Sequence, residues 1–115
     1  MLDFLLQPTR EYSGDLSRYV TENGLAAGQR TGELSGTEDP NRIAYLASHL
    51  EAVQAALAAG VPLKGYFVWS LLDNYEWALG YAKRFGLVHV DFDTLDRTPK
   101  ASYHALRQAL RQDGT

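Results

Sequence analysis

The segment LKGYFVWSLLD, residues 63–73, is apolar at successive positions rather than at alternating ones. A strand that is covered on both faces, as in a parallel sheet, has this continuous pattern. Trp69, Ser70 and Asp73 lie near its end, where we expect the strand to open into a loop. The segment therefore predicts a buried parallel strand that delivers aromatic and polar side chains to one end of a sheet.

A long amphipathic helix is predicted directly before this strand, over residues 39–60. Asp39 suits the N-cap position, Pro40 suits the first helical position, and Gly60 suits the end of the helix. Apolar residues recur at alternating steps of three and four and form the stripe that we expect to be buried. They are Ile43, Leu46, Leu50, Val53 and Leu57.

The chain before this helix predicts a helix end, a strand and a loop. Residues 1–7 suit the end of a helix that Pro8 makes difficult to continue. Residues 17–23, SRYVTEN, predict a short strand that the Asn-Gly pair terminates. Residues 24–38 have no apolar period and predict a long loop, which inside a compact domain is often functional.

After the buried strand, the sequence predicts a loop, a weaker strand and a last helix. The loop covers residues 74–86 and the strand residues 87–93, LVHVDFD. In the helix, Thr98 suits the N-cap and Pro99 the first position. The expected buried stripe is Tyr103, Leu106 and Leu110.

Strands that alternate with helices indicate an α/β fold with a parallel sheet. Two such strands would leave both sheet edges open, so we expect them to belong to a larger closed sheet. In a (β/α)8 barrel, functional residues lie at the carboxyl ends of the strands, which is where Glu22 and the segment from Trp69 to Trp77 fall. Residues 1–115 are expected to form one segment of such a barrel, without a second domain.

Composition excludes several classes of function. The net charge of −3 and the scattered Lys and Arg residues argue against a nucleic-acid partner. The chain contains no Cys, and its three His residues are far apart, so neither a metal nor a cofactor is expected. No apolar run approaches the roughly 20 residues that span a bilayer, and no secretory leader is recognisable. We therefore expect a soluble, cytoplasmic protein.

The candidate functional residues are Glu22, Trp69, Glu76, Trp77 and Phe85. Read locally, Glu22 before Asn-Gly suits a solvated turn charge as well as a catalytic carboxylate, and single aromatic residues more often supply core area. Together, two indoles and a carboxylate match a pyranose, whose C–H faces stack on aromatic rings and whose hydroxyl groups bind a carboxylate. Asp73 and Asn74 are expected to brace the loop, and Lys83 and Arg84 to be surface charges.

Three segments together carry a family resemblance. They are YVTENG (19–24), GYFVWSLLDNYEWALGYAKRFGLVHVDFDT (65–94) and RTPKAS (97–102). Their order and spacing resemble the C-terminal quarter of a glycoside hydrolase family 1 β-glucosidase, and the match runs through nearly the whole chain. The resemblance implies a fragment of a (β/α)8 TIM barrel with strands 7 and 8 and their helices. It also implies hydrolysis of β-glucosides with retention of configuration.

The resemblance also implies roles for individual residues. Glu22, in the TENG motif, matches the family's nucleophile at the end of the seventh strand. Trp69 matches the aromatic platform under the sugar, and Glu76 and Trp77 match the residues that bind its distal hydroxyl groups. Phe85 matches the aromatic residue that closes the same pocket. A carboxylate at position 76 favours unphosphorylated sugars, because it repels a phosphate.

The chain departs from the family pattern in two places. It contains no Asn-Glu-Pro motif, which carries the family's acid/base Glu, and it has Ser17 and Arg18 where members usually have Pro followed by Leu or Ile. The first departure predicts a chain that supplies only the nucleophile half of the site. It would be inactive or very weak until the rest of the barrel completes it.

Besides a β-glycoside substrate, the sequence leaves two alternatives for the protein partner of this chain. The chain either assembles with the complementary N-terminal barrel fragment, or it associates with copies of itself as a structural or carbohydrate-binding module without significant catalysis. A third interpretation is an unrelated βα domain with accidental motifs.

Overall fold

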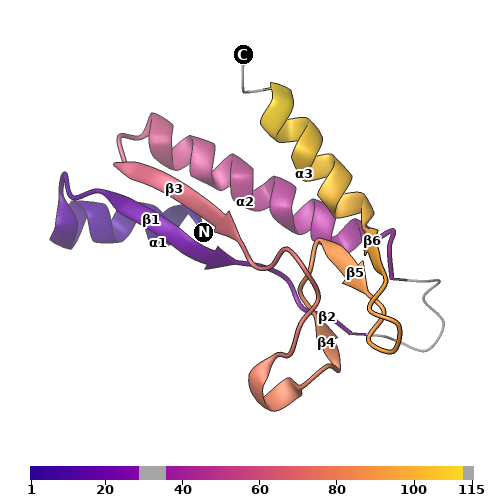
Figure 1. Ribbon diagram of the computed structural model, residues 1–115. Helices are drawn as coiled ribbons and strands as arrows, with labels where there is room; N and C mark the ends of the chain where they lie inside the picture. The colour runs from indigo at the N-terminus through magenta and orange to yellow at the C-terminus, as the bar shows by residue number, and fades with distance from the viewer. Residues whose placement is uncertain (29–35, 113–115) are drawn as a thin grey trace.

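The computed structural model describes residues 1–28 and 36–112, in which helices alternate with short strands (Figure 1). The helices and helical turns are α1 (Leu2–Pro8), η1 (Thr9–Ser13), α2 (Pro40–Ala58), η2 (Trp77–Leu79) and α3 (Ala101–Gln112). The strands are β1 (Arg18–Asn23), β2 (Ala27–Gly28), β3 (Leu63–Val68), β4 (Lys83–Arg84), β5 (Val88–Val90) and β6 (Arg97–Pro99).

The central pair of strands is parallel, as the sequence predicts. β1 pairs with β3, and α2 lies between them in the chain, which makes a βαβ unit. Figure 1 shows α2 running alongside this pair. α1 contributes to the same core as α2. The core between helices and strands contains apolar side chains from α1, α2, the connection after α2 and the start of β3. They are Leu5, Val53, Ala56, Val61 and Leu63, with Val20 and Tyr66 packed against them.

The opposite face of the β1–β3 pair has no cover among residues 1–28 and 36–112. Tyr19 on β1 and Phe67 on β3 are 58% and 57% exposed. The expected burial of β3 on both faces is therefore wrong for this chain. The radius of gyration of 16.1 Å exceeds the roughly 13 Å of a compact domain of similar length, as befits an open layer of strands and helices.

Helix α2 begins where the sequence predicts, with Asp39 at the N-cap and Pro40 at the first position. Leu46 and Val53 are buried, and Ile43 and Leu50 are half-buried, as expected for the apolar stripe. The prediction for the last member is wrong: Leu57 is exposed, and Ala56 takes the place in the core. Gly60 follows the helix with a φ of +89°, a conformation that favours glycine.

The N-terminal helical segment does not stop at Pro8. α1 ends there, but the chain continues through the π-helical turn η1. The carbonyl of Leu5 accepts hydrogen bonds from Thr9 Oγ1 at 2.8 Å and from Arg18 Nη1 at 3.0 Å. These bonds satisfy one carbonyl group in the last turn of α1.

Two further boundaries differ from the prediction. β3 ends at Val68, and the chain after it pairs with the start of β5, through a bridge between Leu72 and Val88. Thr98 and Pro99 do not begin the last helix: they lie in β6, where Thr98 pairs with His89 of β5. α3 begins at Ala101. Tyr103 and Leu106 of its expected buried stripe are half-buried, whereas the prediction for Leu110 is wrong, because Leu110 is exposed.

The predicted loop between β1 and α2 contains a short strand. β2 pairs antiparallel with β4, so the segment after Glu22 is tied to the segment before Phe85. Residues 29–35 of that loop lie outside the described residues. The predicted strand at 87–93 is present as β5 and is shorter.

Candidate active site

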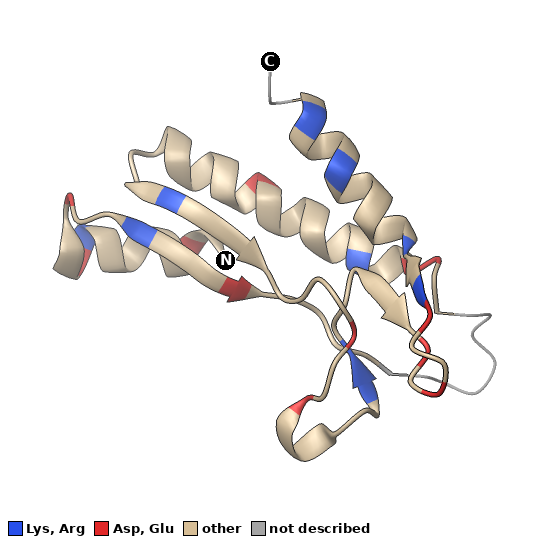
Figure 2. Ribbon diagram, in the orientation of Figure 1, with Lys and Arg blue, Asp and Glu red and all other residues tan. Residues whose placement is uncertain are grey.

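Glu22 lies at the carboxyl end of β1, one residue before the strand ends at Asn23. Its side chain is exposed, and within residues 1–28 and 36–112 its carboxylate forms neither a hydrogen bond nor an ion pair. Figure 2 shows an acidic position at this end of β1 and basic positions at the amino ends of β1 and β3, where Arg18 and Lys64 lie. The charge at the carboxyl end of this parallel pair is therefore negative.

Trp69 is held beside Glu22 by the backbone. Its N–H donates to the carbonyl of Asn23 at 2.8 Å, directly after the pair formed by Asn23 and Val68. Gly24 allows this approach, because a Cβ atom at position 24 would lie 1.9 Å from the carbonyl oxygen of Trp69. The peptide bond between Trp69 and Ser70 is cis. The carboxyl ends of the two strands thus bring the candidate nucleophile and the first candidate sugar-binding indole to one edge.

Phe85 returns to this edge from the far end of the following loop. The N–H of Ser70 donates to the carbonyl of Phe85 at 3.0 Å, and the N–H of Leu87 donates to the carbonyl of Ser70 at 2.9 Å. Phe85 is half-buried. Glu22, Trp69 and Phe85 therefore come from neighbouring backbone segments, although they are far apart in sequence.

Glu76 and Trp77 lie at the tip of the loop between β3 and β4, which extends away from the helices (Figure 1). The N–H of Glu76 donates to the carbonyl of Gly80 at 2.8 Å and closes the tip around η2. Trp77 is 83% exposed. Within the described residues, the side chains of Glu76 and Trp77 make no hydrogen bond to Glu22, Trp69 or Phe85. Glu76 and Trp77 therefore form a second group of candidate residues, separate from the first and exposed at the loop tip.

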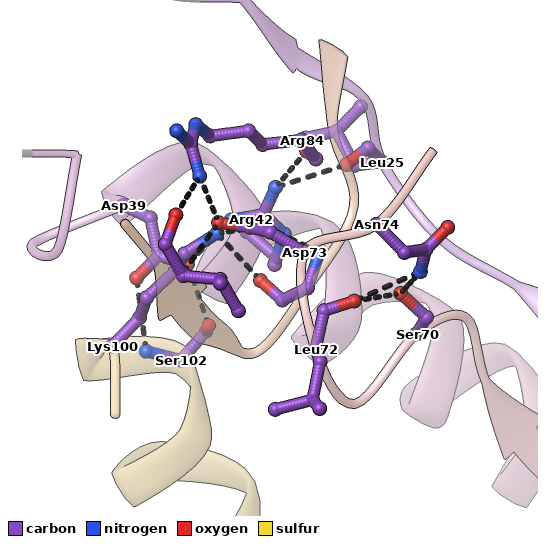
Figure 3. Close-up of polar contacts among 12 residues, drawn as sticks. Leu25, Asp39, Arg42, Ser70, Leu72, Asp73, Asn74, Arg84, Lys100 and Ser102 are labelled. Atoms are coloured by element: carbon purple, nitrogen blue, oxygen red, sulfur yellow. Dashed lines mark hydrogen bonds and ion pairs between the residues drawn. The ribbon is translucent and has the colours of Figure 1, made fainter. Parts of the chain in front are cut away.

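A buried carboxylate supports this loop from below. Asp73 accepts hydrogen bonds from Arg84 Nη1 at 2.7 Å, from Lys100 Nζ at 2.9 Å and from the N–H of Gly86 at 3.0 Å (Figure 3). Its side chain and that of Lys100 are excluded from solvent. Asp73 thus braces the loop, as predicted, and does so with ion pairs rather than as a turn cap.

Arg84 is not the surface charge that the sequence suggests. Its side chain is 12% exposed, and its Nη1 also donates to the carbonyl of Val90 at 2.7 Å. The guanidinium lies 4.3 Å from the ring centroid of Phe92. Arg84 therefore joins the base of the loop to the β5 segment.

The electrostatics of this group favour the ionised carboxylate. Burial by itself raises the pKa of Asp73, but the hydrogen bonds from Lys100 and Arg84 outweigh it and hold the pKa below its ordinary value of 3.8. Asp73 consequently stays charged near neutral pH and anchors both cations.

A second buried group joins α2 to α3 and to the β4 segment. Arg42 Nη1 donates to Asp39 Oδ2 at 2.7 Å, and Nη2 donates to the carbonyl groups of Leu25 and Arg84 at 3.1 and 2.8 Å. The other contacts of the Asp39 carboxylate come from the N–H and the hydroxyl group of Ser102. The Asp-x-x-Arg spacing at a helix start was the only sequence signal for this pair. Nothing local indicated Ser102.

Two negative findings apply to the described part of the chain. Residues 1–28 and 36–112 contain no group of three or more His, Asp or Glu side chains placed to hold a metal ion. In the same residues, no helix combines the length and the apolar character that a membrane span requires.

Known proteins resemble this chain in sequence. A model of glycosyl hydrolase family 1 matches residues 2–115. The 1,4-beta-D-glucan glucohydrolase of Thermotoga neapolitana is 46% identical over 111 residues, which are 96% of this chain and 25% of the relative. Beta-glucosidase A of Thermotoga maritima is 44% identical over 111 residues, again 96% of this chain and 25% of the relative.

A solved structure gives the same result. The family 1 b-glucosidase from Thermotoga maritima in complex with isofagomine lactam matches with a TM-score of 0.87 and 44% identity, covering 97% of this chain and 25% of that one. The chain spans about a quarter of the length of the curated relatives it matches. Its open sheet and one-sided helices are therefore part of a (β/α)8 barrel, and the chain belongs to glycosyl hydrolase family 1.

Proposed function

We propose that this chain supplies the nucleophile half of a retaining β-glucosidase site, with Glu22 as the nucleophile. In this proposal β1 and β3 are the seventh and eighth strands of the barrel, and the chain forms its C-terminal quarter. The position of Glu22 beside Trp69, at the carboxyl ends of two adjacent parallel strands, carries the proposal. Active sites of (β/α)8 enzymes lie at this end of the strands.

Retention of configuration needs two carboxyl groups roughly 5 to 5.5 Å apart. The Glu22 carboxylate attacks the anomeric carbon, and the bond to the leaving oxygen breaks as the second group protonates it. The covalent glycosyl-enzyme is then hydrolysed by water that the second group, now a base, activates. The sequence has no Asn-Glu-Pro motif, so we assign the acid/base Glu to a barrel segment outside this chain.

The remaining candidate residues bind the sugar in this proposal. Trp69 stacks on the apolar face of the pyranose, and Glu76 and Trp77 bind the distal hydroxyl groups. Phe85 closes the pocket behind them. Support comes from the backbone pairing of Trp69, Ser70 and Phe85 and from the open tip that carries Glu76 and Trp77. The substrate is a β-glucoside or a related β-glycoside without a phosphate group.

Complementation tests the proposal. The partner fragment is Beta-glucosidase A of Thermotoga maritima without the quarter that this chain matches. Mixing it with the chain should release the aryl group from an aryl β-glucoside, and Glu22→Gln should remove this activity while leaving assembly intact. A fluorosugar reagent should label Glu22 in the mixture. If the mixture hydrolyses no faster than either fragment alone, the proposal is wrong.

A second candidate function follows from the uncovered face of β1 and β3. Exposed Tyr19 and Phe67 favour association through this face, and a second copy of the chain could cover it as well as the missing barrel strands could. The chain would then be a self-associating carbohydrate-binding or structural module. Sedimentation distinguishes the two candidates, because a compact folded monomer excludes self-association.

A further inference from the structure

Strand β1 contains an extra residue directly before its end. Val20 pairs with Tyr66 and Asn23 pairs with Val68, so three steps along β1 oppose two steps along β3. This is the geometry of a β-bulge, which bends a strand and changes the direction of its side chains. Thr21 and Glu22, the two residues inside the bulge, are exposed.

The bulge breaks the usual alternation of side chains. Val20 packs against the core that α2 covers, and Asn23 forms a hydrogen bond with Tyr45 of α2. In a regular strand, residues three positions apart point to opposite faces. Here both residues point toward α2. In a regular strand Glu22 would share the face of Val20, but the bulge allows its side chain to point away from the helix.

The Asn23 side chain is held at both ends by phenol groups. The hydroxyl group of Tyr66, on β3, donates to Asn23 Oδ1 at 2.5 Å. Asn23 Nδ2 donates to the hydroxyl oxygen of Tyr45, on α2, at 3.2 Å. The Asn23 carbonyl accepts the N–H of Trp69 at 2.8 Å. One residue thus connects the end of β1 to the helix, to the neighbouring strand and to the indole-bearing segment.

Both phenol groups are themselves fixed. The ring of Tyr45 stacks on His49, with 3.8 Å between the ring centroids. Burial, with a smaller contribution from Tyr45, raises the pKa of Tyr66 to about 12, so its hydroxyl group remains a hydrogen-bond donor throughout the neutral range. The three side chains therefore form a stable unit, which we call the asparagine clamp (Tyr45, Asn23 and Tyr66).

We infer that the asparagine clamp is a positioning device that locks the bulge and so sets the direction of the Glu22 carboxylate. The inference rests on the proposed nucleophile role of Glu22, and it assigns a positioning role to Tyr45 and Tyr66, which act through Asn23. A nucleophile must stand about 3 to 3.5 Å from the carbon it attacks, and a shift of about 1 Å costs on the order of 100-fold in rate. A looser bulge should therefore slow the attack itself and leave sugar binding unchanged.

Single hydroxyl deletions test the clamp in the complemented enzyme. Tyr66→Phe keeps the ring and removes only the donor to Asn23. We expect labelling of Glu22 by an activated fluoroglucoside to be about 10- to 100-fold slower at saturating reagent, with an unchanged half-saturating concentration. Tyr45→Phe should act in the same direction. Tyr12→Phe is the matched control, because Tyr12 is 84% exposed and lies in η1. In this variant, Glu22 should be labelled at the wild-type rate.

The outcomes separate the clamp from the nucleophile assignment. If wild type is labelled and Tyr66→Phe is labelled equally fast, the clamp is wrong and the nucleophile assignment stands. If wild type is not labelled at Glu22, the proposed function is wrong.

Hydrogen exchange on the chain alone tests the clamp without activity. Tyr66→Phe should speed the exchange of the Trp69 amide, which bonds to Asn23, and leave the α3 amides unchanged. Identical exchange of the Trp69 amide in variant and wild type would overturn the inference whatever the labelling shows.

Discussion

Lys100 places its Nζ 2.9 Å from Oδ1 of Asp73, across 27 residues of sequence, and both side chains are shielded from solvent. With Arg84 on the other carboxylate oxygen, this pair connects the loop after β3 to the start of α3. The loop that carries Glu76 and Trp77 therefore has a rigid base and an exposed tip.

Asp73→Asn should be strongly destabilising. The substitution leaves Lys100 and Arg84 buried without their shared anion, and breaking a buried ion pair in this way costs about 3–5 kcal/mol. Urea denaturation followed by circular dichroism measures the loss. Asp93→Asn, an exposed position in the turn before β6, is the control and should stay within about 0.5 kcal/mol of wild type. Equal midpoints for the two variants would contradict the structural role of Asp73.

Acid should destabilise the chain partly through the same carboxylate. The pKa of Asp73 is lower in the folded state than its ordinary value of 3.8, so its contribution is present above that value and is lost as the pH falls through the folded-state pKa. The free energy of unfolding of wild type should fall more steeply below about pH 4 than that of Asp73→Asn. Parallel curves for the two proteins would show that Asp73 is not the responsible group.

Alkali should destabilise the chain through Tyr66. Its pKa is raised from 10.0 to about 12 in the folded state, so the stabilisation is complete below pH 10 and is lost as the pH rises toward 12. Phenolate absorbance should show a tyrosine that ionises only as the pH approaches about 12. Tyr66→Phe should remove this step and flatten the alkaline loss of stability, whereas Tyr12→Phe should leave both in place.

Ser102→Ala should weaken the connection between α3 and α2. The Ser102 hydroxyl group donates to the Asp39 carboxylate, and a hydrogen bond to a charged group contributes about 1.5–3 kcal/mol. Ser48→Ala removes a hydroxyl group that bonds to a carbonyl within its own helix, on an exposed surface, and should cost clearly less. Thermal unfolding of both variants provides the comparison, and a Ser102→Ala variant as stable as Ser48→Ala would be unexpected.

Gly24→Ala should move the backbone of Trp69 away from the end of β1. The added Cβ atom would meet the Trp69 carbonyl oxygen at 1.9 Å, so one of the two strands must move. We expect a loss of stability of about 1–3 kcal/mol and a changed near-ultraviolet signal from the tryptophans. Ala26→Ser adds an atom at an exposed position nearby and should have neither effect.

Local patterns predicted the elements, while contacts between distant segments decided the details. The periodic stripe of α2 and the continuous apolar run of β3 can each be read within a few residues, and both elements are present. Thr98-Pro99 gave the usual signal for a helix start, but the same two residues pair with β5, and that partner is not visible locally. Family motifs identified the barrel, because spacing over the whole chain carries more information than any single element.

Sequence motifs supplied the candidate site residues, but the side chains that support their backbone were not predicted. Glu22, Trp69 and Phe85 come from motifs, and the structure brings their backbones together. The ion pairs of Arg84 and Arg42 were missed, because a charged residue in a sequence resembles a surface residue until its partner is known. The bulge before Asn23 was missed for a related reason: it depends on how β1 is paired with β3.

The two tryptophans lie in contrasting environments, so their fluorescence can report on the candidate site. Trp69 is 37% exposed, Trp77 is 83% exposed, and the sequence contains no other tryptophan. A sugar that stacks on either ring would shift and quench the emission of that ring alone. Fluorescence of Trp69→Phe and Trp77→Phe would then assign each part of the signal, so binding could be followed without a label and even when no bond is cleaved.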